Sequence, residues 1–400
     1  MKTRKLYEED SFLKSCKAVV TGCVQDKEGW AVSLNQTVFF PEGGGQPSDT
    51  GRLGETAVSY VYEKDGEVWH RCGQPLEPGA QVEAVIDWDR RLDHIQQHTG
   101  EHVFSYAIWK KFGVGNIGFH LGKEVVTIDL TRALTPEELE ASENFANQIV
   151  WEDHPIRTFW RKDDDLEDLE MRKKTEKVAG MLRIVQVEDG DVCTCCGTHA
   201  SATGQIGPIK VLRQESHKGG VRLEFVCGDR ALRDYQLKHK QITAIGADLS
   251  TKEEGIFAAV RNLKEEASQL RSQLRARSAL LMAARAKELI EASAPRKDAR
   301  VLCAVQEDID TKEAKMLLTS LLEAGEKTTA AVVYADGQRV GYLLGSTQGG
   351  LDCKNLCQAA NGLWGGKGGG SPTFAQGSGK LSAGWKDSAQ SLARLMEQML

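Results

Sequence analysis

The segment HTGEH at residues 98–102 constrains this chain more than any other stretch. If the segment is helical, His98 and His102 lie on one face, because 3.6 residues per turn bring positions i and i+4 together. The flanking sequence supports a helix, since apolar residues such as Ile95 and Val103 recur at helical spacing. Two such histidines can hold one metal ion only if another part of the chain supplies the remaining ligands.

The segment CTCCGTH at residues 193–199 contains ligands that would complete such a site. Cys195 and His199 bracket Cys-Gly-Thr, a short loop that can fold both side chains toward one point. Three histidines and one cysteine suit tetrahedral zinc. Spacing alone leaves the choice of thiol open, because Cys193 and Cys196 are near enough to replace Cys195.

Glu101 gives the first segment a second interpretation. Residues 98–102 also read H-x-x-E-H, the inverted zincin motif, in which the glutamate is the general base of peptide hydrolysis. Such peptidases take a third, carboxylate ligand and keep a position open for water, whereas Cys195 and His199 would fill the coordination sphere. The peptidase is therefore the less favoured alternative.

Residues 1–88 and 89–248 differ in their hydrophobic pattern. The first range alternates short β-rich runs with glycine and proline turns, which predicts a small antiparallel β-barrel or sandwich. The second range combines two helices with several strand-like runs, which predicts an α+β domain. In its second helix Thr135 is the expected N-cap, Pro136 the first residue and Glu138 the residue that closes a capping box.

The remainder of the chain is expected to form a helical arm at 249–293 and a compact α/β domain at 294–400. Apolar residues of the arm follow steps of four and three that are broken only at Arg277. Such a seam requires a partner helix, which either a homodimer or an intrachain hairpin can supply. The seam consists of Ile256, Val260, Leu263, Ala267, Leu270, Leu274 and Leu281. The fold class expected for the whole chain is therefore α+β and multidomain.

Composition excludes membrane and disordered classes. The chain is 40% hydrophobic and 27% charged, as in soluble globular proteins. Its longest apolar runs are a few residues, far short of the roughly 20 that span a bilayer. The start, MKTRKLYEEDSF, has acidic residues where a signal peptide needs an apolar core. Ten cysteines without regular spacing indicate reduced thiols, so the expected location is the cytoplasm.

Four motifs in order resemble one family. They are FFPEGGGQPSDTGRLG at 39–54, HTGEH at 98–102, CCGTHASATGQIGPIK at 195–210 and GGKGGGSPTFAQGSG at 365–379. Together they resemble the editing half of alanyl-tRNA synthetase, and more closely its freestanding relatives, the AlaX-type alanyl-tRNA editing proteins of the long form. The resemblance spans nearly the whole chain. It implies a β-barrel domain with a glycine-rich motif, a zinc-containing editing domain, a helical arm and a DHHA1-like RNA-binding domain.

The resemblance also implies ligands and a substrate. The family's zinc set carries over to His98, His102, Cys195 and His199, while Cys196 stands where many relatives have glycine. The implied substrate is the ester that joins a wrong amino acid, chiefly serine with glycine second, to the terminal ribose of alanine tRNA. No class II aminoacylation domain precedes the β-rich region, so the chain is expected to proofread tRNA without charging it.

Three polar residues are candidates for catalysis. A site that hydrogen-bonds the serine hydroxyl, and leaves polar groups unpaired when alanine enters, can discriminate between the two amino acids. Thr99, Glu101 and His120 are the candidates for that contact and for orienting water. Many relatives have threonine in place of Glu101, which weakens the transfer of a role to that residue.

Four further residues are candidates for contacting substrate or tRNA. By resemblance, PEGGGQ packs toward the editing cleft, which makes Gly44 and Gln46 candidates. In the last domain Lys367 is expected to contact phosphate. Trp364 is a candidate for stacking on a nucleotide, with a buried tryptophan as the equal alternative.

The function expected from the sequence is trans-editing: zinc-dependent deacylation of mischarged alanine tRNA. The alternatives are a non-catalytic, zinc-containing module that binds tRNA and, less favoured, an inverted-zincin metallopeptidase. The expected cofactor is Zn²⁺, and the expected partners are alanine tRNA and, through the arm, a second copy of the chain. No membrane partner is expected.

Overall fold

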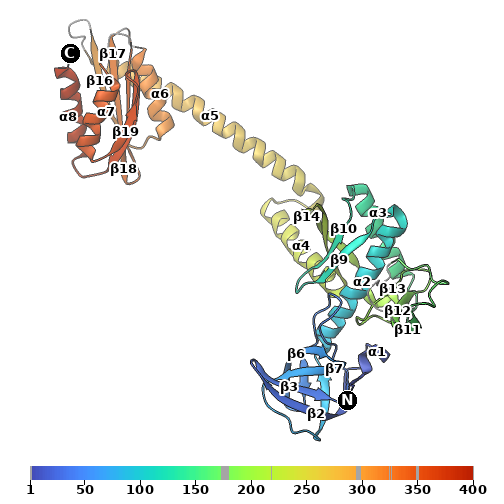
Figure 1. Cartoon of the computed structure of the whole chain (residues 1–400). Coiled ribbons are helices and arrows are strands. Elements are labelled where there is room, and N and C mark those ends of the chain that lie inside the picture. The colour runs from blue at the N-terminus through green and yellow to red at the C-terminus, as the bar shows by residue number, and fades with distance from the viewer. Residues whose placement is uncertain are drawn as a thin grey trace. The chain divides into compact units, whose positions relative to one another are not determined.

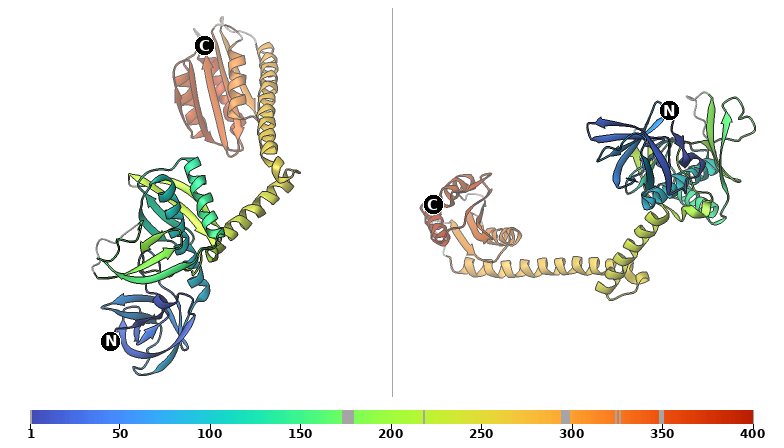
Figure 2. Two further views of the ribbon diagram at one scale, coloured as in Figure 1. Left: turned by 90° about the vertical axis from the view of Figure 1, so that its right-hand side faces the viewer. Right: turned by 90° about the horizontal axis from the view of Figure 1, so that it is seen from below.

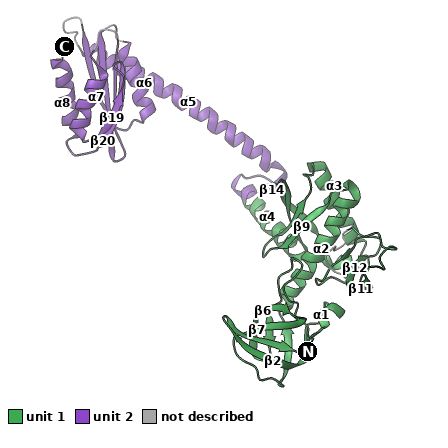
Figure 3. Ribbon diagram, in the orientation of Figure 1, with its two compact units in different colours: residues 1–244 green, residues 245–400 purple. Residues whose placement is uncertain are grey.

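The computed structural model describes most of the chain and separates it into two compact units, residues 1–244 and 245–400 (Figure 3). The described residues are 2–172, 180–217, 219–293, 299–323, 325, 327–347 and 351–399. Both units combine helices with sheets (Figure 1), so the α+β, multidomain class is confirmed. The finer division into four domains stays a prediction, and residue 294, where the last of them begins, lies outside the described residues.

Unit 1 begins with a closed β-barrel in which neighbouring strands are antiparallel. Buried side chains alternate with more exposed ones along Thr56–Lys64 and Glu67–Cys72, as the two-residue period of a strand requires. Helix α1 (Leu6–Glu9) and the short parallel pair of β1 (Arg4–Lys5) and β4 (Gln36–Thr37) lie outside the barrel sheet. The barrel strands are β2 (Ser15–Asp26), β3 (Gly29–Leu34), β5 (Gly51–Leu53), β6 (Thr56–Lys64), β7 (Glu67–Cys72) and β8 (Gln81–Ile86).

Helix α2 (Trp88–Phe112) follows the barrel and carries the histidine pair. Its first turn is capped by the Asp87 side chain, which accepts a hydrogen bond from the Arg90 N–H. It ends at Gly113, whose φ of 65° is the left-handed conformation that glycine adopts without strain.

Two antiparallel sheets complete unit 1, with orders β14-β15-β10-β9 and β11-β12-β13. The first packs against α2 and α3 around a core that includes Phe104, Ile128 and Phe225. Helix α3 begins with the predicted capping box between Thr135 and Glu138, which is confirmed. The elements are β9 (Asn116–Leu121), β10 (Val126–Leu130), α3 (Pro136–Trp151), β11 (Ile156–Lys162), β12 (Met181–Val187), β13 (Val192–Thr194), a 3-10 turn (Thr203–Ile206), β14 (Ile209–His217), β15 (Gly220–Cys227) and α4 (Gly228–Asp248).

A buried ion pair fastens the barrel to α2. Arg91 and Asp49 are both fully buried and hydrogen-bonded to each other. The Arg91 guanidinium also donates to the carbonyl oxygens of Ser11 at 2.8 Å and Val38 at 2.6 Å. Asp49 follows the glycine-rich motif closely, so this pair holds that motif against the helix that carries the two histidines.

Unit 2 contains a mixed five-stranded sheet of order β16-β17-β18-β20-β19. Helices α5 and α6 pack on one face, and α7 and α8 pack on the other (Figure 2). No helix of the described residues is long and apolar enough to cross a membrane. The elements are α5 (Ile256–Glu291), β16 (Arg300–Gln306), α6 (Thr311–Leu322), β17 (Thr328–Asp336), β18 (Arg339–Ser346), α7 (Cys353–Trp364), β19 (Lys367–Gly370), β20 (Phe374–Lys380) and α8 (Trp385–Gln398).

The apolar seam of α5 is largely exposed. Leu263, Leu270 and Leu274 are 56%, 57% and 66% exposed. Only the far end of α5 packs on α6, through Met282 and Ala286. The alternative of an intrachain hairpin is therefore not what the structure shows, and the homodimer stays a prediction.

The prediction that Trp364 stacks on a nucleotide is wrong. The residue ends α7 and is only 4% exposed, packed face to face on Tyr342 with ring centroids 5.4 Å apart. Its indole N–H donates to the Trp385 carbonyl oxygen. A side chain in this position belongs to the core of unit 2. Lys367 is exposed on β19, and its expected phosphate contact stays a prediction.

Candidate functional site

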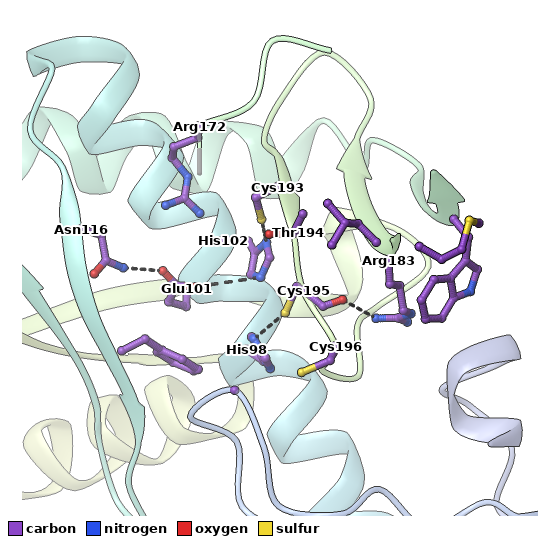
Figure 4. Close-up of a pocket in the computed structure, with 15 residues that line it drawn as sticks. His98, Glu101, His102, Asn116, Arg172, Arg183, Cys193, Thr194, Cys195 and Cys196 are labelled. Atoms are coloured by element: carbon purple, nitrogen blue, oxygen red, sulfur yellow. Dashed lines mark hydrogen bonds and ion pairs between the residues drawn. The ribbon is translucent and has the colours of Figure 1, made fainter. Parts of the chain in front are cut away.

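The structure brings together the four residues that the sequence singles out as metal ligands. His98 and His102 project from α2, and Cys195 and His199 come from the loop after β13. One potential ligand atom from each lies within 4.8 Å of the other three. The Cys195 Sγ lies 3.3 Å from the His98 Nε2, and Figure 4 shows His98, His102 and Cys195 pointing toward one another.

A glycine allows the two segments to approach so closely. A Cβ atom at Gly197 would lie 2.1 Å from the His98 Cε1, which is shorter than real Cβ contacts, so a larger residue would force the loop away from α2. On α2 itself, a Cβ atom at Gly100 would lie 2.2 Å from the Cys227 Sγ, so this glycine lets the helix pack closely on Cys227. The Ala200 N–H also donates to the Thr99 Oγ1 at 3.0 Å, which ties the loop to the helix between the two histidines.

Gln46 orients the first histidine. Its amide oxygen lies 2.7 Å from the His98 Nδ1 and also accepts from the Thr198 N–H, while its amide nitrogen donates to the Thr198 Oγ1. An amide oxygen only accepts hydrogen bonds, so the His98 Nδ1 carries the proton and Nε2 presents its lone pair to the cluster. Gln46 is fully buried behind His98, a proposed metal ligand, so the structure does not support the predicted contact of Gln46 with substrate or tRNA.

Asp191 and Arg172 orient the second histidine. The His102 Nδ1 lies 3.2 Å from the Asp191 carboxylate and 3.1 Å from the Cys193 Sγ. Arg172 contacts both carboxylate oxygens, at 2.7 and 2.9 Å. Burial would raise the pKa of Asp191, but hydrogen bonds from His102 and Arg172 lower it to about 2.

His102, Asp191 and Cys193 form a second group of side chains close enough together to hold a metal ion. Arg172 already occupies both oxygens of Asp191, however, and a guanidinium beside a cation is electrostatically unfavourable. The geometry matches the carboxylate–histidine arrangement that commonly supports a metal ligand. We therefore assign Asp191, Arg172 and Cys193 to the support of His102.

The cluster has the chemistry that zinc requires. Neither ring nitrogen of His199 has a hydrogen-bond partner among the described residues, although the ring is buried. Burial lowers the pKa of His199 to about 3, so the neutral ring has one unprotonated nitrogen whose lone pair can bind a metal. Burial alone would raise the pKa of the Cys195 thiol, but His98 and His199 lower it well below its ordinary value. A thiolate and neutral imidazoles are the forms that bind zinc, so these residues fit the ion.

The cluster lies in a cavity of about 460 Å³. Glu101 lies in its wall, with one carboxylate oxygen accepting from the Ser105 Oγ at 2.6 Å and the Asn116 Nδ2 at 2.7 Å. The other oxygen lies 4.0 Å from the His102 Nε2. Other residues of the wall are Gly44, Phe119, Trp160, Met181, Arg183 and Cys196.

Of the other residues predicted to act in the site, Gly44 lines the cavity, whereas Thr99 and His120 do not. Gly44 lies in the cavity wall beside the Cys196 Sγ. Thr99 is 1% exposed, and its hydroxyl already serves the Ala200 N–H, so the structure does not bring it into the cavity. His120 is exposed on β9 and does not line the cavity either. The burial of Thr99 contradicts the role predicted for it, whereas the role expected of His120 stays a prediction.

Sequence reasoning missed the residues that support the site. Asp191 and Arg172 lie far from α2 in sequence, and neither belongs to the ligand motifs. One local signal was available, because Asp191, Cys193 and Cys195 are spaced by two and a strand places such residues on one side. Asn116 and Trp160 gave no comparable signal.

Comparisons with known proteins agree with this arrangement. Residues 182–224 match the family described as Threonyl and Alanyl tRNA synthetase second additional domain, and residues 298–400 match the DHHA1 domain. The first match contains Cys195 and His199.

Three relatives illustrate the similarity. The chain is 33% identical over 248 residues to the alanyl-tRNA editing protein AlaX-L of Pyrococcus horikoshii, which covers 58% of this chain and 61% of that protein. It is 32% identical over 276 residues to the alanyl-tRNA editing protein Aarsd1 of Rattus norvegicus, with coverage of 65% and 67%. It is 34% identical over 293 residues to an alanine–tRNA ligase of Pyrococcus furiosus, with coverage of 68% and 32%.

The chain thus spans from 32% to 67% of the length of these curated relatives. The match to Aarsd1 extends over two thirds of that protein, and both matched domains occur in the expected order. This chain therefore belongs to the family of AlaX-type alanyl-tRNA editing proteins.

Proposed function

We propose that this protein is a zinc-dependent editing hydrolase that removes wrong amino acids, serine first and glycine second, from alanine tRNA. The convergence of His98, His102, Cys195 and His199 at one cavity is the observation that carries this proposal. It is supported by the names of the relatives, which describe alanyl-tRNA editing proteins. The proposed compartment is the cytoplasm, in keeping with ten free cysteines.

Physical limits on selectivity explain why such an activity is needed. A pocket sized for alanine cannot strongly exclude glycine, which is smaller, or serine, which adds only a hydroxyl group. A second site can sort by a different rule if its polar groups bind the serine hydroxyl and are left unpaired by alanine. In this cavity Glu101 and Asn116 are two of the polar groups that lie beside the proposed metal centre.

The chain's own residues would do most of the catalytic work. Zinc held by the four side chains would supply positive charge beside the ester and would fix the shape of the cavity floor. Ser105 and Asn116 hold one oxygen of Glu101, so the other oxygen faces the cluster and accepts a proton from the attacking water. The ester is already reactive, so positioning the terminal adenosine and one water accounts for much of the remaining catalysis.

The peptidase alternative is not supported by the geometry. An inverted zincin requires a third, carboxylate ligand and an open position. Here a thiol and a third imidazole belong to the cluster, and Glu101 is outside it. The binding module remains an outcome that experiment can identify.

Deacylation assays test the proposal. Seryl-, glycyl- and alanyl-tRNA are incubated with the full chain, with and without a zinc chelator, and after zinc is returned. We expect rapid release of serine, slower release of glycine and little release of alanine, with loss on chelation and recovery with zinc. His199→Ala should abolish the activity, whereas His154→Ala, whose ring pairs with Glu152 at the surface, should not. A protein that binds these tRNAs and leaves every ester intact would refute the proposal.

The exposed seam of α5 supports a homodimer as the assembly in which the protein works. Replacing Leu263 and Leu270 by alanine should lower the mass measured by light scattering, because both side chains are exposed in the single chain. An unchanged mass would argue against this dimer.

A further inference from the structure

Trp160 is an exposed aromatic residue at the edge of the candidate cavity. It lies on β11, is 48% exposed, and lines the cavity that contains the metal cluster. It also lines two adjoining hollows, which places it where the cavity opens outward. Of the eight tryptophans, only Trp151 is more exposed, and it ends α3 away from the cavity wall.

The strand register places Trp160 on the same side of the sheet as the residues that reach the metal cluster. Trp160 pairs with Arg183 across β11 and β12, and Met181 is the diagonal neighbour on the same face. Met181 is 53% exposed and lines the cavity as well. In the next pair of strands Val185 opposes Cys193, so this face continues to the thiol beside His102. Two large apolar side chains thus stand uncovered at the mouth of a polar site.

Arg183 gives an independent sign that a ligand belongs here. It is only 6% exposed and donates to the carbonyl oxygens of Cys195 and Gly197. Its buried Nε has no hydrogen-bond partner among the described residues. A buried cationic donor left unpaired is costly, and Arg183 lines the cavity, so a small shift of its side chain toward an acceptor bound there would satisfy this donor.

A terminal adenosine supplies both partners that this wall of the cavity leaves open, namely an aromatic face for Trp160 and Met181 and a hydrogen-bond acceptor for Arg183. The purine offers a flat aromatic face for an indole and a thioether, and its ring nitrogens and ribose hydroxyls accept hydrogen bonds. An aminoacyl ester held at the metal cluster is attached to that same nucleoside. We propose that Trp160, together with Met181, stacks on the base of the 3′-terminal nucleotide while Arg183 donates to the nucleoside. This inference rests on the proposed function for its substrate, and it assigns a binding role to residues outside the metal cluster.

A fluorescence experiment tests the stacking without any catalysis. The probe is an uncharged RNA hairpin that carries the acceptor stem of alanine tRNA, with 2-aminopurine as its terminal base. Stacking on an indole should quench this base when the full-length, zinc-loaded protein is added. Trp160→Ala should abolish the quenching and weaken binding about 5- to 150-fold, the range expected for one lost base–aromatic stack.

Two variants control for trivial effects. Trp160→Phe keeps an aromatic face and should retain most of the quenching. Trp151→Ala removes the other exposed tryptophan and should behave as wild type. Trp160 is half exposed, so its replacement should leave the melting temperature unchanged. Equal quenching by the wild type and Trp160→Ala, or no quenching by the wild type, would overturn the proposal.

Kinetics separate this inference from the proposed function. With a seryl-charged hairpin, Trp160→Ala should raise KM and leave kcat nearly unchanged, because stacking is made equally before and during the reaction. If the wild type quenches the probe but hydrolyses no ester, the deacylase fails and the nucleoside site stands. If hydrolysis by Trp160→Ala equals that of the wild type in both KM and kcat, the nucleoside site fails and the deacylase stands.

Discussion

Replacing Gln46 by leucine should weaken zinc binding although Gln46 is not a ligand. The change removes the acceptor of the His98 Nδ1–H and of the Thr198 N–H. Each buried donor left unpaired costs about 1–3 kcal/mol, so two unpaired donors would cost a site that cannot rearrange about 2–6 kcal/mol of stability. Rotation of the His98 ring would relieve part of this cost by turning Nε2 away from the cluster. We therefore expect zinc affinity to fall about 10–100-fold, as is typical when a residue that orients a metal ligand is replaced.

Gln46→Glu is the matched variant. Its carboxylate accepts from both donors, and the Thr198 hydroxyl can rotate to donate to the second oxygen. Zinc affinity is measured by competition with a chromophoric chelator, and seryl-tRNA hydrolysis is followed in parallel. Gln36→Leu controls for the loss of an amide elsewhere, because the Gln36 side-chain amide donates to the Lys17 carbonyl oxygen on the barrel. Wild-type affinity in Gln46→Leu, or equal losses in the leucine and glutamate variants, would refute the role assigned to Gln46.

Two further changes test the framework of the site. Gly197→Ala should lower the zinc content measured by elemental analysis, because its Cβ would lie 2.1 Å from a His98 ring atom, whereas Gly43→Ala has open space and should retain zinc; equal zinc contents would contradict the close approach. Arg91→Met should destabilise the first unit by about 3–5 kcal/mol in urea unfolding, because it leaves Asp49 buried without its partner. Adding Asp49→Asn should restore part of that stability, and an equally unstable double variant would show that charge burial is not the cause.

Local sequence signals predicted what depends on local physics. The Thr135 and Glu138 capping box is confirmed, because its hydrogen bonds join residues three apart. The four proposed ligands also come together, because i, i+4 spacing on a helix and a short Cys-Gly-Thr loop each place two side chains on one side. The arm's seam is present on α5 with its leucines exposed, but the pattern could not say whether a second chain covers them.

Contacts between distant segments could not be predicted in the same way. Nothing in the sequence near Gln46 indicates that its amide meets His98, because the contact depends on how the barrel is fastened to α2. The burial of Trp364 depends on what the neighbouring glycine-rich stretch forms, which the sequence alone does not show. In the structure that stretch forms β19 and β20, and Trp364 ends a helix packed on them. Glycine disfavours strands by its own propensity, so only pairing with β18 determines this conformation.

X-ray absorption at the zinc edge of the native, full-length protein tests the central claim most directly. One zinc ion per chain, with three nitrogen ligands at about 2.0–2.1 Å and one sulfur ligand at about 2.3 Å, is the predicted result. The sulfur contribution should disappear in Cys195→Ser and persist in Cys196→Ser, since Cys195 alone of these two belongs to the cluster. A protein without zinc, or a zinc shell of nitrogen and oxygen without sulfur, would contradict the account.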